Sequence, residues 1–177
     1  MTESLHAVPQ RMPEADAAST VEAFETFFDA ERVRLLGALI VMTGNKAEAE
    51  ELLQDAFLKV WERWDRVAAM ENPSGYLYRT ALNLYRRRLR RASVAMRRAF
   101  NILPNTDELA GVEVRDEAVR LLGKLTPRER AAIVITAYLG YSSEEAARLM
   151  GISANTVRVL TGRARATLRA AEEASSD

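Results

Sequence analysis

The chain has 177 residues, with 25 lysines and arginines, 25 aspartates and glutamates, one histidine and no cysteine. The lack of cysteine excludes disulfides and cysteine nucleophiles, and the single histidine, His6, disfavours zinc sites and most histidine-dependent catalysis. We therefore expect no catalytic residue, no metal site and no cofactor. No signal peptide and no apolar run near the roughly 18 residues of a membrane span is found, which indicates a soluble, cytoplasmic protein.

The net charge of zero conceals four blocks of opposite sign. Residues 1–71 carry a net charge of −7, residues 72–106 carry +8, residues 107–117 carry −4, and residues 118–177 carry +3. The second block holds eight arginines and no acid. Such a stretch is typical of a segment that binds a polyanion or an acidic partner, although a solvated helix face is the plainer alternative.

Residues 1–19 have no hydrophobic periodicity and are predicted to form a mobile tail. From Val21 the apolar residues recur at helical spacing, which predicts a helix that ends at Gly44. The residues that define this pattern are Phe24, Phe28, Leu35, Leu39 and Met42.

A second helix is predicted to begin after Asn45, a residue type that caps helix N-termini. One side of it is an apolar stripe, to which we assign Trp61 and Trp64 as core residues. The opposite face is acidic apart from one leucine, and consists of Glu51, Gln54, Asp55, Leu58 and Glu62.

The next segment, Asp65 to Glu71, is predicted to be a loop, and Pro73 suits the first turn of a third helix. This helix has a packed side and a basic side with a tyrosine at its start. The basic side holds Tyr76, Arg79, Thr80, Asn83, Arg86, Arg87 and Arg90.

Residues 99–113 contain Pro104 and Gly111 without a firm period, which indicates a flexible linker. Helices are then predicted from about Val114 to Lys124 and, after the capping residue Thr126, through Tyr138.

Ser142 caps the following helix and Ser153 caps the last one, with Gly151 at the tight turn between them. Small Ala147 and buried Val157 complete the spacing of a helix-turn-helix, whose second helix enters the DNA major groove. One exposed row of that helix is predicted to contain Arg158, Thr161, Arg165 and Arg169.

The last helix has residues suited to both bases and phosphates. Asn155 favours adenine and Arg158 favours guanine, while the later arginines suit phosphates. The candidate DNA-binding residues are Ser153, Asn155, Thr156, Arg158, Val159, Arg163 and Arg165.

Residues 47–91 resemble region two, and residues 121–169 resemble region four, of the sigma factors of bacterial RNA polymerase. Only these two regions are present, which is the layout of the extracytoplasmic-function (ECF) group of the sigma-70 family. The resemblance implies an all-α fold. Its parts are an N-terminal tail (1–19), a region 2 helical domain (20–98), a linker (99–113), a region 4 helix-turn-helix domain (114–171) and a short tail (172–177).

The resemblance also implies a function without an enzymatic activity. A sigma factor binds core RNA polymerase, directs it to the −35 and −10 promoter elements and promotes DNA melting. The acidic face around Leu58 would bind the clamp of the beta-prime subunit. The basic face from Tyr76 to Arg90 would bind the downstream element, with flipped bases entering the loop from Asp65 to Ser74, and the last helix would bind the upstream duplex. The group commonly has anti-sigma factors as partners, and the resemblance implies neither a small-molecule substrate nor membrane insertion.

Two features leave alternatives open. Val159, Leu160, Thr161 and Gly162 depart from the usual continuation of the family motif, which puts the recognised DNA sequence in question. A helix-turn-helix regulator that binds duplex DNA as a dimer would explain the second half equally well, but not the acid-free basic helix of the first half. An enzyme is disfavoured, because the sequence has no glycine-rich phosphate loop and no nucleophile paired with a base.

Overall fold

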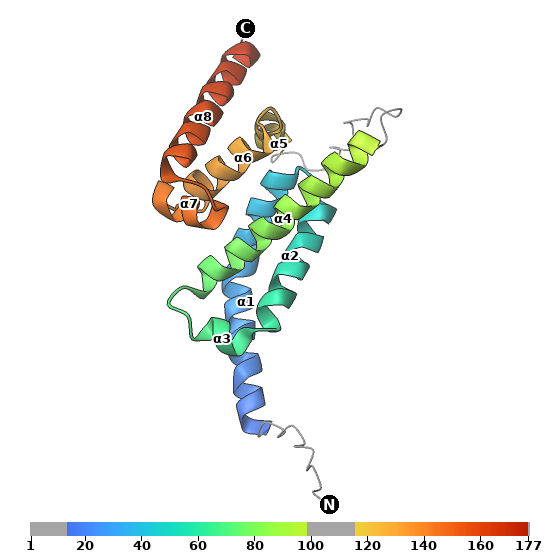
Figure 1. Ribbon diagram of the computed structural model, residues 1–177, viewed down its shortest axis with the longest axis vertical. Helices are drawn as coiled ribbons and strands as arrows, with labels where there is room; N and C mark the ends of the chain where they lie inside the picture. Colours follow the sequence, from blue (N-terminus) through green and yellow to red (C-terminus); the bar gives the residue numbers. More distant parts are fainter. Residues whose placement is uncertain (1–13, 99–115, 177) are drawn as a thin grey trace, which may run out of the picture.

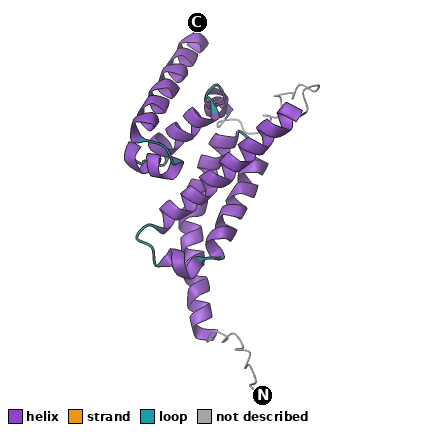
Figure 2. Cartoon of the chain, viewed as in Figure 1, coloured by secondary structure: helices purple, strands orange, loops and turns teal. Residues whose placement is uncertain are grey.

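The computed structural model describes residues 14–98 and 116–176, and side chains within residues 18–92 and 120–174. These ranges contain helices, turns and loops and no strand (Figure 2). No helix in them is long and apolar enough to cross a membrane. In chain order the elements are α1 (Glu14–Thr43), α2 (Lys46–Trp61), α3 (Trp64–Ala68), α4 (Pro73–Arg98), α5 (Asp116–Gly123), α6 (Pro127–Ile133), the π-helical turn η1 (Val134–Tyr138), α7 (Ser143–Met150) and α8 (Ala154–Ser176).

The first half is a bundle of the long helices α1, α2 and α4, with the short α3 across one end (Figure 1). Asn45 has an extended backbone, and its side-chain oxygen accepts a hydrogen bond from the Glu48 N–H at 3.0 Å, as the sequence predicted for the start of α2. Leu35, Leu39 and Leu77 of this bundle are almost completely buried. This packing holds the outward faces of α2 and α4 in fixed orientations.

Two boundaries of the first half differ from the prediction. α1 begins at Glu14, inside the stretch predicted as a tail, and residues 1–13 lie outside the described residues. The segment predicted as a loop from Asp65 begins with the helix α3, which has no side-chain cap to mark its start. Trp64 and Val67 of α3 are buried, and burial of these two side chains stabilises a helix of only five residues.

In the second half α6, α7 and α8 begin where the sequence predicted, but two of their ends differ from the prediction. The helix predicted through Tyr138 changes at Val134 to the π-helical turn η1, and α8 continues to Ser176, through most of the predicted tail at 172–177. Thr126 and Ser142 each form a complete capping box, with Glu129 and Glu145 as the third helical residues. Gly151 ends α7 with a φ of 64°, the left-handed conformation expected at the turn of a helix-turn-helix. The predicted linker, residues 99–113, lies outside the described residues.

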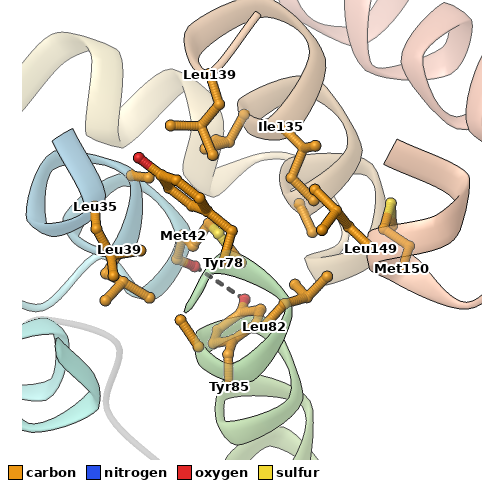
Figure 3. Packing of buried hydrophobic residues seen from close by; sticks show 14 of the residues in the cluster. Leu35, Leu39, Met42, Tyr78, Leu82, Tyr85, Ile135, Leu139, Leu149 and Met150 are labelled. Atoms are coloured by element: carbon orange, nitrogen blue, oxygen red, sulfur yellow. Dashed lines mark hydrogen bonds between the residues drawn. The ribbon is translucent and has the colours of Figure 1, made fainter. Parts of the chain in front are cut away.

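The two halves pack directly against each other along one continuous core (Figure 3). Leu39 of α1 and Leu82 of α4 lie on one side of the junction, and Ile135, Leu139 and Leu149 lie on the other. The sequence predicted two separate domains. It indicated which side chains are buried, and the structure shows that some of them are buried against the other domain.

Three arginines cross this junction and donate hydrogen bonds to carbonyls at helix C-terminal ends. Arg34 of α1 donates to the Leu139 carbonyl at 2.5 Å, Arg86 of α4 donates to the Met150 carbonyl at 2.7 Å, and Arg130 of α6 donates to the Met42 carbonyl at 3.0 Å. The last carbonyls of a helix have no partner within the helix, so each arginine supplies a donor to such a carbonyl, and the Met42 carbonyl also accepts a hydrogen bond from the Tyr85 hydroxyl at 2.9 Å (Figure 3). Each half therefore caps helices of the other.

Candidate nucleic-acid and protein interfaces

The acidic face of α2 is exposed as the sequence predicted. Leu58 is 57% exposed and lies among exposed polar side chains. Arg88 of α4 borders this face, with its Nε 3.1 Å from a Glu48 carboxylate oxygen and its Nη1 2.7 Å from one of Glu51. The exposed polar residues around Leu58 are Glu51, Gln54, Asp55 and Glu62.

Trp61 extends this face and was wrongly assigned to the core. It is 40% exposed, whereas Trp64 is only 7% exposed, as predicted. The centroid of the Trp61 ring lies 4.8 Å from that of the Phe24 ring in α1. Val21, one turn before Phe24 in α1, is also exposed. Trp61 follows Leu58 by three residues and so lies on the same side of the helix. Trp61 also lies four residues after the buried Phe57, so helical spacing alone fits either side.

The predicted basic face of α4 borders a polar pocket of about 250 Å³. Arg63 lies in the turn between α2 and α3, and its Nη1 donates a hydrogen bond of 3.3 Å to the hydroxyl of Tyr76 in α4. The pocket therefore joins residues predicted for DNA binding to the end of the acidic face. It is lined by Lys59, Glu62, Arg63, Tyr76, Thr80, Asn83, Leu84 and Arg87. Lys59 and Arg63 are cationic lining residues that the sequence analysis did not select.

The arginines of the predicted α4 face differ in their surroundings. Arg79, Arg87 and Arg90 are exposed, as a DNA-binding role requires. Arg86 is half-buried, and its guanidinium donates to the Met150 carbonyl of α7. The helical period places Arg86 near the basic side, but packing of α7 against α4 draws this side chain into the junction. Its DNA contact remains a prediction that requires release of this bond.

The N-terminal end of α8 is held by Ser153, whose side-chain oxygen accepts a hydrogen bond from the Thr156 N–H at 3.1 Å. Val157 is fully buried and anchors the helix. Arg158 forms an ion pair with Glu144 of α7. The predicted DNA-binding residues of the last helix segment are all exposed, namely Ser153, Asn155, Thr156, Arg158, Val159, Arg163 and Arg165.

The prediction that Thr161 belongs to the exposed row of α8 was wrong. Thr161 is 7% exposed, and its hydroxyl donates to the Val157 carbonyl of the same helix at 3.0 Å. Because the hydroxyl is satisfied within the helix, the side chain can be buried at little cost. Gly162, by contrast, is exposed, and a Cβ at this position would have no heavy atom within 4 Å apart from its chain neighbours and the backbone of its own helix.

Two protein-family models match the two halves of the chain. The model for "Sigma-70 region 2" matches residues 27–94, and the model for "Sigma-70, region 4" matches residues 115–168. The ECF RNA polymerase sigma factor SigM of Mycobacterium tuberculosis is 32% identical over 156 residues, which cover 87% of this chain and 79% of SigM. The chain belongs to the ECF group of the sigma-70 family. It directs RNA polymerase to specific promoters for transcription initiation.

Further relatives agree with this assignment. The RNA polymerase sigma factor CnrH of Cupriavidus metallidurans is 34% identical over 149 residues, which cover 75% of this chain and 77% of CnrH. The structure of CnrH with the cytosolic domain of CnrY superposes with a TM-score of 0.63, at 31% identity, and covers 90% of this chain and 94% of that one. The sigma factor RpoE of Bartonella quintana, solved with the anti-sigma factor NepR, has the same fold, with a TM-score of 0.71 at 21% identity over 84% of this chain and 95% of that one. The basic helix of the first half lies within the region 2 match. The alternative hypothesis of a dimeric helix-turn-helix regulator did not explain this helix.

Proposed function

We propose that this sigma factor uses three separate surfaces, one for core polymerase and two for promoter DNA. The observation that carries the proposal is the separation of charge on the folded chain. An acidic face with an apolar centre lies on α2, and exposed arginines lie on α4 and α8. Polymerase works in the cytoplasm, where we place this protein.

The α2 face is the proposed site for the clamp of the beta-prime subunit. Leu58 supplies an apolar anchor, and the surrounding acids supply charge that selects a basic partner surface. We add Trp61 to this site, because it continues the exposed apolar surface beyond Leu58 and its ring packs against that of Phe24. Large aromatic side chains are frequent anchors of protein interfaces.

The two DNA surfaces are proposed to divide the promoter between them. Arg79, Asn83 and Arg87 of α4 hold the backbone of the downstream element, and the adjoining polar pocket and loop accept unstacked bases. Asn155 and Arg158 contact base edges of the upstream duplex at the exposed N-terminal end of α8. The downstream surface thus acts on opened DNA, and the upstream surface acts on duplex.

An anti-sigma factor is proposed as a further partner. RpoE of Bartonella quintana was solved with the anti-sigma factor NepR, and CnrH was solved with the cytosolic domain of CnrY. By analogy with these relatives, we expect a protein that binds this sigma factor and blocks its exposed surfaces.

The clamp site is tested by co-purification with core polymerase. Because Asp55 and Leu58 are both exposed, the double variant Asp55→Arg, Leu58→Asp should fold normally and lose the core polymerase. Val33→Asp is the matched control, since Val33 is an exposed apolar residue on a different helix, at 69% exposure. Retained binding by the double variant, or equal loss by the control, would contradict the clamp assignment.

A further inference from the structure

Glu31, in the middle of α1, is the one acid that joins α1 to the start of α4 among the described residues. Its two carboxylate oxygens accept hydrogen bonds from the Ser74 hydroxyl at 2.6 Å and the Tyr78 hydroxyl at 2.9 Å. Ser74 and Tyr78 are one turn apart in the first two turns of α4. Both bonds have a charged acceptor, which makes them stronger than bonds between neutral groups.

We propose that Glu31 is a positioning residue for promoter opening, which holds the first turns of α4 and the preceding loop in the geometry that the opened strand requires. This inference rests on the proposed function of α4. Glu31 itself lies on α1 and belongs to neither the predicted DNA face nor the predicted clamp face.

The contacts of the first turn of α4 explain how Glu31 would act. The loop after α3 ends at Asn72, whose side-chain oxygen accepts a hydrogen bond of 2.7 Å from the Gly75 N–H. The adjacent Ser74 is held by Glu31, so the loop end is fixed both to α4 and to the bundle. Tyr76 and Arg79, the first residues of the proposed DNA face, alternate with Ser74 and Tyr78 on this stretch of helix. Loss of the Glu31 bonds would therefore free the part of α4 nearest the proposed base-accepting loop.

The other half of the molecule contacts the same tyrosine from a second direction. The Tyr78 ring lies 5.9 Å from the ring of Tyr141, in an edge-to-face arrangement, while its hydroxyl points to Glu31. Burial and the bond to Glu31 raise the pKa of Tyr78 well above its usual range, so the phenol stays protonated and remains a donor. If the two halves separate, Tyr78 loses Tyr141 and keeps Glu31. Glu31 then remains as a support of the first turns of α4 that does not depend on the position of region 4.

The experiment compares promoter opening with promoter and polymerase binding, in holoenzyme reconstituted from core polymerase and the full chain. Opening is followed by the fluorescence of 2-aminopurine placed in the downstream element of a linear promoter. Loss of one hydrogen bond to a charged group changes an equilibrium or rate constant by about tenfold or more. Glu31→Ala should therefore lower the rate of promoter opening by at least about tenfold. Affinity for core polymerase and for the closed promoter should stay within about twofold of the wild type.

Smaller changes and a control keep the test independent of folding. Ser74→Ala and Tyr78→Phe each remove one donor and leave the backbone and the Tyr141 contact in place, and each should reproduce part of the defect. Combined with Glu31→Ala they should add little, because the partner is already gone. Glu31→Gln, which keeps one carbonyl acceptor, should restore opening in part. Glu25→Ala, an exposed acid on the same helix, should open DNA like the wild type.

A promoter with a mismatched, already open downstream element distinguishes the outcomes. Recovery of transcription by Glu31→Ala on this template would support the proposal. An equal defect on both templates, wild-type opening by Glu31→Ala, or a parallel loss of core affinity in the Ser74 and Tyr78 variants would overturn it. A wild-type chain that cannot initiate with core polymerase would instead overturn the proposed function itself.

Discussion

The helices α4 and α8 both carry exposed arginines, but they have different surroundings. α4 lies between α2 and α7, and its arginines are divided among neighbours, with Arg86 bound to the Met150 carbonyl and Arg88 bound to Glu48 and Glu51. α8 lies at the outer side of the second half (Figure 1). Its residues Arg163 and Arg165 are exposed to solvent. An arginine in a helix can thus be exposed to solvent, bind across a domain junction or pair with a neighbouring acid, and the packing of the helix decides which.

The largest expected effect belongs to Arg130 of α6, which binds across the same domain junction as Arg86 of α4. Its guanidinium donates to the carbonyls of Met42, Gly123 and Leu125. Arg130→Met keeps most of the apolar stem but removes these bonds, and should lower the free energy of unfolding by about 2–3 kcal/mol. Urea unfolding measures this change. Arg128→Met, at an exposed position of the same helix, is the control and should change stability by less than about 0.5 kcal/mol.

The second effect concerns DNA affinity rather than stability. Arg158→Ala should weaken binding to the upstream element by about 1–3 kcal/mol, because the proposed contact is to a base edge. The ion pair with Glu144 is exposed and contributes little to folding, so the unfolding midpoint should hardly move. Fluorescence anisotropy of holoenzyme on labelled promoter DNA gives the affinity. If the preference among promoter sequences is unchanged, Arg158 does not read a base.

The third effect separates two adjacent arginines of α4. Arg86→Ala should destabilise the chain by about 1.5 kcal/mol, since the Met150 carbonyl loses a charged donor. Arg87→Ala should leave stability unchanged and weaken binding to single-stranded downstream DNA, because Arg87 is exposed beside the polar pocket. Parallel urea unfolding and DNA binding of the two variants check this. Equal losses of stability in the two variants would contradict the prediction that only Arg86 stabilises the junction between the two halves.

The smallest effect is a gain in stability at Gly162. A glycine inside a helix destabilises it by roughly 0.8–1 kcal/mol relative to alanine, and a Cβ at this position meets no heavy atom within 4 Å apart from its chain neighbours and the backbone of its own helix. Gly162→Ala should therefore raise the unfolding free energy by up to about 1 kcal/mol. Unchanged promoter binding by this variant would show that the glycine is not needed for close approach to DNA, and weaker binding would show that it is.

Local signals in the sequence predicted much of the fold, because helix ends depend on a few neighbouring residues. The caps at Asn45, Thr126 and Ser142 and the turn at Gly151 lie where the sequence places them. α3 was missed for the same reason, since the residue before it, Arg63, provides no side-chain cap.

Features set by contacts between distant segments could not be predicted in the same way. The apolar spacing of Tyr78 and Leu82 predicts burial but does not say which helix covers them. The Glu31 bonds join residues more than 40 positions apart. Trp61 fits the apolar stripe of α2 by spacing, but it is the last residue of that helix and is only partly covered. The candidate surfaces follow from helical periodicity, whereas the division of the α4 arginines requires the packed structure.

The central claim, that these surfaces together direct polymerase to promoters, is tested most directly by transcription in vitro. Core polymerase is incubated with a genomic library of promoter fragments, with and without this chain, and the transcript starts are sequenced. The account predicts new starts that appear only when the chain is present, downstream of a shared pair of sequence elements. An identical set of starts in both reactions, together with binding of the chain alone to a palindromic duplex, would contradict it.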